Sequence, residues 1–317
     1  NSWQVRRARR ILAERRDTQV IDQLRSLSQN PDDSSLALQA LWTLNAVGAF
    51  DQSREGSLLT HQDPHIRAWT IRFIGDNNLV SPENWKKLLS IVKTDDSPTV
   101  ISQLASSAKR LPAEQCITLV RTLLDRSEFR NDPHIPLLLW WALERYSISS
   151  LEAVLQTFSR PEDWQNPFLR DVILGRLMRR FAGEGSDASL AACARLLATA
   201  PEGSERRRML SELDAGLKML GRERLPGLPL GPKYGSIAAI NRVQKSEQVK
   251  RLKTLPPELA DQLATIWNDN TTDALIIRVA IRLGNKADHD RALALVADRN
   301  QTENTRLEML ADPAGTG

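Results

Sequence analysis

Proline recurs at a nearly constant interval through the first two thirds of the sequence. The recurring prolines are Pro31, Pro64, Pro98, Pro133, Pro167 and Pro201, and successive members are separated by 33, 34, 35, 34 and 34 residues. A fixed period in this range is typical of stacked helical repeats, in which each unit is a pair of helices packed on its neighbours. The sequence therefore predicts an all-α superhelix of helix pairs with about 34 residues per repeat.

The stretch 61–75 shows how one unit is encoded. Asp63 is placed to cap the first free N–H groups of a helix, and Pro64 fits the first helical position because its missing N–H is not needed there. The 3.6-residue period predicts one apolar face, formed by Ile66, Trp69, Phe73 and Ile74. We expect Gly75 to end this helix.

The same reading extends along the chain. We predict helices over 2–15, 18–28, 34–47, 52–60, 64–74, 82–93, 98–110, 112–125, 133–146, 149–159, 167–182, 187–199, 202–220, 237–253, 257–268, 272–284, 288–298 and 303–311. No segment shows the alternation typical of strands. Three regions are expected: helical repeats in 1–220, a Gly/Pro-rich linker or crossover in 221–235, and less regular repeats in 236–317.

Positive charge is concentrated at the start of the chain. Six of the first 16 residues are arginine and one is glutamate, so this segment has a formal charge of +5. The whole chain has a formal charge of +4, so the remaining residues sum to about −1. We expect Val5, Ala8, Ile11 and Leu12 to pack inward and Arg6, Arg9, Arg10 and Arg16 to face solvent. These four arginines are candidate partner-binding residues, which would contact an acidic partner, a membrane surface or nucleic acid. The alternative is a solvated helix, or one covered by a preceding domain.

Eight tryptophans make up half of the aromatic residues, and most fall on predicted apolar helix faces. Trp140 and Trp141 are adjacent, so they point about 100° apart on a helix and cannot both enter the same core. One of this pair is the second candidate for partner binding.

No catalytic, metal or cofactor site is predicted. His65 and His134 lie at equivalent positions two repeats apart, on the order of 20 Å from each other, which is too far to share a metal. They and His61 are expected to be exposed turn residues, and Asp63 and Asp132 to be helix caps. Cys116 and Cys193 lie in apolar helical contexts and are expected to be buried. No apolar run is long enough for a transmembrane helix.

Two resemblances follow from these motifs. The run Asp63-Pro64-His65-Ile66-Arg67, with its partial copies at 132–135 and 166–170, is similar to HEAT repeats, which implies a HEAT-like helical-repeat solenoid. The segments 3–16, 40–44 and 132–144 resemble the helical region of the PVC-type membrane-bound dehydrogenase family, including its haem-binding (CxxCH) members. The match covers about residues 1–180.

That second resemblance implies a segment placed between a β-propeller and a cytochrome c domain in an extracytoplasmic protein. The 317 residues contain no Cys-x-x-Cys-His motif for haem attachment. The segment itself is therefore expected to be no enzyme and to need no cofactor, although the parent protein would be an oxidoreductase.

We favour a non-enzymatic scaffold or protein-interaction module that contacts other domains of the parent chain or protein partners. An alternative is a DNA-binding HEAT-like protein of the glycosylase kind, which would use the arginine groups at 176–180 and 206–208 and the cations at 250–253 on a concave face. A third hypothesis, a redox component in its own right, would require haem or metal in the purified chain.

Overall fold

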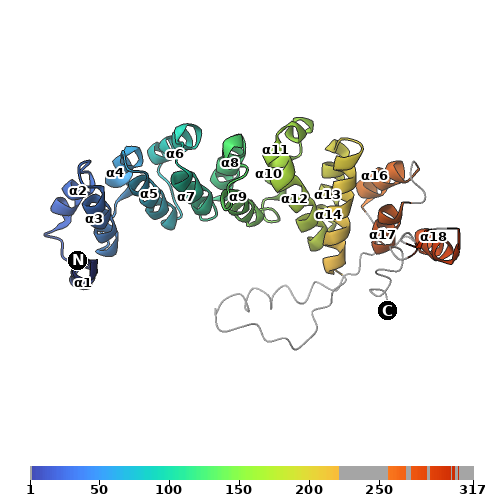
Figure 1. Cartoon of the computed structure of the whole chain (residues 1–317), viewed down its shortest axis with the longest axis horizontal. Helices are drawn as coiled ribbons and strands as arrows, with labels where there is room; N and C mark the ends of the chain where they lie inside the picture. The colour runs from blue at the N-terminus through green and yellow to red at the C-terminus, as the bar shows by residue number, and fades with distance from the viewer. Residues whose placement is uncertain are drawn as a thin grey trace, which may run out of the picture. The chain divides into compact units, whose positions relative to one another are not determined.

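The computed structural model describes residues 2–220, 256–268, 273–283 and 286–300, with isolated positions at 302, 303 and 306. The described residues form helices and turns with no β-strand (Figure 1). The all-α prediction is therefore confirmed. The predicted 221–235 linker and the helix over 237–253 lie outside the described residues, as does most of the helix over 303–311.

The chain divides into two compact units. The first contains Asn1–Thr157 and Gln165–Val172, and the second contains Phe158–Trp164 and Ile173–Gly317.

The helices of the first unit are short and joined by tight turns. They are α1 (Ser2–Arg15), α2 (Ile21–Ser28), α3 (Ser34–Ala46), α4 (Gln52–Glu55) with the 3₁₀ turn η1 (Gly56–Thr60), α5 (Pro64–Asp76), α6 (Pro82–Thr94), α7 (Pro98–Ala108), α8 (Ala113–Leu124), η2 (Ser127–Phe129), α9 (Ile135–Glu144) and α10 (Leu151–Phe158). Helices α1, α3, α5, α7 and α9 contact one another in that order, and α6 contacts α8. Contacts thus run between every second helix.

The second unit continues with helices and no strand among its described residues. They are η3 (Pro161–Gln165), α12 (Gly175–Glu184), α13 (Asp187–Thr199), α14 (Ser204–Leu220), α16 (Pro257–Asn268), α17 (Ala274–Arg282) and α18 (Lys286–Ala297). The short helix α11 (Pro167–Leu169) belongs to the first unit, and the π-helical turn η4 (Arg170–Leu174) continues the chain from it to the start of α12, so the predicted helix over 167–182 is not a continuous α-helix. Helix α12 packs on α13 and α14, and α14 packs on α17.

All six recurring prolines lie at the beginning of a helix or just before one. Pro64, Pro98 and Pro167 begin α5, α7 and α11. The other three precede α3, α9 and α14 by two or three residues. Asp63 caps α5 as predicted, with its side chain accepting from the backbone N–H of His65 at 2.7 Å. The proline period is therefore a period of helix starts.

The predicted starts of two helices and the second half of a third are wrong. Helix α9 begins at Ile135 and not at Pro133, and its N-cap is His134 and not Asp132, although the Asp132 side chain accepts from the N–H groups of His134 and Ile135. Helix α8 begins one residue after Pro112, which has an extended ψ of 152° and acts as the N-cap. The segment 56–60 of the predicted 52–60 helix is a 3₁₀ turn.

Gly75 does not end its helix, because α5 continues to Asp76 and Asn77 is its C-cap. A Cβ atom at position 75 would lie 3.0 Å from the Cβ of Ser107 in α7. Close approach of α5 and α7 therefore accounts for this glycine. Gly48, by contrast, has φ +77° just after the C-cap of α3, so this glycine does end a helix.

Candidate functional site

The first helix is rotated relative to the prediction. Val5 and Ile11 are exposed and Ala8 is too, whereas Arg9 is half-buried. The guanidinium carbon of Arg9 lies 4.9 Å from the centre of the Trp42 ring on α3, and Arg9 also donates to the side-chain oxygen of Gln39. Burial, and then the charge of Arg6, lower the pKa of Arg9.

The prediction that Val5, Ala8, Ile11 and Leu12 pack inward is thus wrong for the first three. The prediction that Arg9 faces solvent is also wrong. Helix α1 packs on α3, where the half-buried Trp42 offers a flat aromatic face. A guanidinium group covers an aromatic ring well, since cation–π attraction adds to the contact made by its aliphatic stem. Hydropathy patterns treat arginine as a solvent residue and miss this arrangement.

The outward half of α1 combines cations with apolar side chains. We define the basic face of α1 as Trp3, Arg6, Arg7, Arg10, Ile11 and Arg15, which fall within one half of the helix circumference. Trp3 is 56% exposed and Ile11 is 37% exposed. Arg10 pairs with Glu14 at 2.7 Å, and Arg7 stacks 5.2 Å from the Trp3 ring centre. Within the described residues, Arg6, Arg15 and the exposed Arg16 have no ion pair.

The two adjacent tryptophans of α9 separate as their spacing requires. Trp140 is buried in the helix packing, and Trp141 is 45% exposed. Leu137, one turn before Trp141, is also exposed, and Arg145, one turn after it, lies with its guanidinium 5.6 Å from the Tyr146 ring. We call Leu137, Trp141 and Arg145 the α9 patch. It lies in the first unit.

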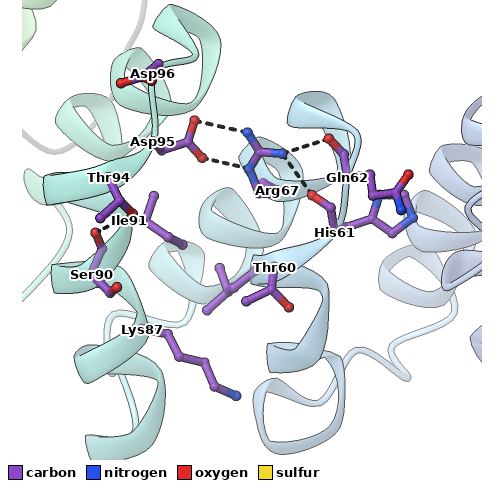
Figure 2. A pocket seen from close by; sticks show the side chains of 11 residues that line it. Thr60, His61, Gln62, Arg67, Lys87, Ser90, Ile91, Thr94, Asp95 and Asp96 are labelled. Atoms are coloured by element: carbon purple, nitrogen blue, oxygen red, sulfur yellow. Dashed lines mark hydrogen bonds and ion pairs between the residues drawn. The ribbon is translucent and has the colours of Figure 1, made fainter.

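A cavity of about 440 Å³ opens between the η1–α5 turn and α6 in the first unit (Figure 2). Arg67 spans one side of it: Nε and Nη2 donate to the two carboxylate oxygens of Asp95 at 2.7 and 3.0 Å, and Nη1 donates to the carbonyls of His61 and Gln62 at 2.8 and 2.9 Å. The side chains of Arg67 and Asp95 are only 17% and 7% exposed. Asp95 additionally accepts from the N–H of Ser97 at the start of α7.

The charged side chains that line this cavity all have oppositely charged partners: Arg67 pairs with Asp95, and Asp96 pairs with Arg126 outside the cavity. Lys87, on α6, pairs with Glu83 at 2.7 Å. The bonds of Arg67 and Asp95 connect the turn before α5, which contains His61 and Gln62, to the turn before α7. We interpret it as a structural connection between successive turns.

Comparable connections recur in the first unit. Arg25 donates to Glu55 at 2.9 Å and to the carbonyl of Ala49. Arg126 donates to the carbonyl of Val92 at 2.7 Å and to Asp96 at 3.1 Å. Arg25 thus bonds to residues 24 and 30 positions away, and Arg126 to residues 34 and 30 positions away, in other helices or turns. These connections were not predicted from the sequence, in which Arg67 after Asp63-Pro64-His65-Ile66 is the available signal.

Five of the arginines required by the DNA-binding alternative, Arg179, Arg180, Arg206, Arg207 and Arg208, are paired with carboxylates. Arg179 pairs with Glu212 at 2.6 Å, Arg180 with Glu184 at 3.4 Å and Arg206 with Glu202 at 3.5 Å. Arg207 pairs with Asp273 and Arg208 with Glu205. The cations at 250–253 lie outside the described residues. A phosphate backbone would have to compete with these carboxylates, which disfavours a DNA interface there.

The remaining candidate residues have structural surroundings. Cys116 and Cys193 are fully buried, and burial raises the pKa of Cys116 to about 12 and also raises the pKa of Cys193, so both thiols stay protonated near neutral pH. His65 and His134 are exposed, as predicted. His61 is only partly exposed: its Nδ1 accepts from the N–H of Asp63, which corrects the prediction of an exposed turn residue.

No group of three or more His, Cys, Asp or Glu residues in the described part of the chain could hold a metal ion. None of the helices described is both long and apolar enough to cross a membrane.

Comparison with known proteins found no matching family model, no matching curated protein and no matching solved structure.

Proposed function

We propose that this chain is a non-enzymatic helical-repeat scaffold of the HEAT-like kind that binds protein partners. The observation that carries the proposal is the contact pattern of the first unit. Helices α1, α3, α5, α7 and α9 contact one another in that order, and arginine side chains such as Arg67 and Arg126 bond to residues about 30 positions away. In stacked helical repeats each unit contacts only its neighbours, and such a stack presents long side-chain surfaces to partners.

The α9 patch is the protein-binding surface that we propose. Tryptophan and arginine are enriched among the few residues that dominate binding energy at protein interfaces, and the exposed Leu137 adds apolar surface beside them. Trp140, the other member of the predicted pair, is used for packing within the unit.

We further propose, from the sequence resemblance, that the chain is the middle segment of a larger dehydrogenase or cytochrome-type protein located outside the cytoplasm. The sequence on either side of residues 1–317 tests this part. A β-propeller before it and a Cys-x-x-Cys-His motif after it would support the proposal, and flanking domains of another class would contradict it.

A photo-cross-linking experiment tests the interaction surface. A benzophenone amino acid is placed at position 141 of the chain in its native cell and, as a control, at position 79, where Leu79 is 67% exposed outside the patch. We expect an adduct from position 141 on a defined segment of one partner or flanking domain, and none from position 79. We also expect Leu137→Ala to abolish the adduct. Equal labelling from both positions would contradict the proposal.

A further inference from the structure

We propose that the basic face of α1 docks on an anionic lipid surface. This inference goes beyond the scaffold role, since a helical-repeat scaffold could bind protein partners through α9 with a neutral first helix.

The positive charge of α1 complements the negative charge of an anionic lipid surface. Arg6 and Arg15 are exposed and have no ion pair within the described residues, and Arg7 lies beside Trp3. Glu14 is the single carboxylate of α1 and is paired with Arg10. The helix therefore presents a net positive surface, unlike the arginines of α12 and α14, whose partners are carboxylates on the same or neighbouring helices.

Apolar groups also lie among the arginines of α1. Trp3 and Ile11 project from the same half of the helix as the cations, at 56% and 37% exposure. Tryptophan and arginine both suit the membrane interface, where an apolar body can enter the acyl boundary while polar groups stay among the headgroups.

The protruding Trp3 side chain fits a deformable surface better than a rigid one. A protruding indole between guanidinium groups requires a complementary pocket on a rigid protein partner, whereas a lipid surface deforms around it. A helix lying in the interface plane with arginines near phosphate groups needs no pocket, and each basic residue near an anionic surface strengthens binding about fivefold.

The test uses the full 317-residue chain and vesicles of 70% phosphatidylcholine and 30% phosphatidylglycerol, with pure phosphatidylcholine vesicles as the lipid control. Co-sedimentation at about 50 mM salt should show binding to the anionic vesicles alone, and binding should fall as salt is raised because exposed charges are screened. Binding of equal strength to both vesicle types would overturn the proposal.

Two variants test the named side chains. Arg6→Gln with Arg7→Gln should weaken binding about 25-fold, at about fivefold for each arginine. Trp3→Ser should weaken it about tenfold, because the indole would no longer enter the interface. Matched controls remove two exposed cations of α6, as Lys86→Gln with Lys93→Gln, or one exposed apolar residue, as Leu79→Ser. Controls that weaken binding as much as the α1 variants would overturn the proposal.

Trp3 also provides a spectroscopic signal. We expect a blue shift of the tryptophan emission on anionic vesicles, and this shift should disappear in Trp3→Phe while vesicle binding is retained. Binding to duplex DNA at the same salt, without binding to vesicles, would show that α1 recognises a polyanion other than lipid and would overturn the proposal. An unchanged thermal unfolding midpoint verifies that each variant is folded.

Discussion

Replacing Arg67 tests the connection between turns most sharply. Arg67→Met removes four hydrogen bonds and leaves the carboxylate of Asp95, which is 7% exposed, without its cation. Removing one partner of a buried ion pair costs about 3–5 kcal/mol, mostly because the remaining charge is left uncompensated. Since the Arg67 side chain retains 17% exposure and the N–H of Ser97 still binds Asp95, we expect a loss near the lower limit, about 3 kcal/mol.

A double-mutant cycle separates the ion pair from the other bonds of Arg67. Asp95→Asn preserves an oxygen that can accept from Ser97 and leaves Arg67 bound to two carbonyls, so we expect a smaller loss of about 2 kcal/mol. The double variant should lose less than the sum, with a coupling energy of about 2 kcal/mol.

The assay is urea unfolding of the full chain, followed by circular dichroism. The slope of the unfolding free energy against urea concentration is compared between variants, because a changed slope would show loss of cooperativity between the two units. Lys87→Met is the matched control: it lines the same cavity, but its pair with Glu83 is exposed, so about 0.5 kcal/mol is expected. A loss for Arg67→Met no larger than that of the control would refute the reasoning.

Four further substitutions have defined outcomes in the same unfolding assay. Trp42→Ala should cost about 3 kcal/mol, because it removes ring contacts with Trp69 at 5.1 Å as well as with Arg9. His65→Ala, at an exposed position, should change stability by less than about 0.5 kcal/mol. Gly75→Ala should cost about 1–2 kcal/mol because its Cβ would crowd α7. Burial raises the pKa of Asp63, but hydrogen bonds from the N–H groups of His65 and Ile66 and from the Ser34 side chain together outweigh it and lower this pKa. The stability contributed by the Asp63 carboxylate is therefore present above the ordinary aspartate pKa and is lost as pH falls through the lowered value, and Asp63→Asn should reduce this acid sensitivity.

The sequence predicted the helices well because their starts are encoded locally. Asp63, Ser81 and Asn166 each cap a helix that begins with proline, and a capping side chain acts within three residues of its own position. Helix ends were less reliable where the deciding contact comes from another element. Gly75 has the sequence signature of a stop, yet its role is the approach to Ser107 on α7.

The candidate surfaces could be predicted only in part for the same reason. The spacing of Trp140 and Trp141 required one of them to leave the core, but the neighbouring helices determine which one does. The orientation of α1 was wrong because Arg9 packs on Trp42, a contact across 33 positions of sequence. Bonds between turns, such as Arg67 to Asp95, likewise depend on the packed arrangement.

The central claim is that the stability of each helix pair depends on the helix pairs next to it, as in a repeat scaffold. Hydrogen–deuterium exchange of the full chain carrying Leu44→Ala tests it directly, since Leu44 is fully buried in α3. The account predicts faster exchange in α1, α3 and α5, with unchanged exchange in α9 and in α12–α14. A uniform increase through all helices would contradict it, because it would show one cooperative globular core.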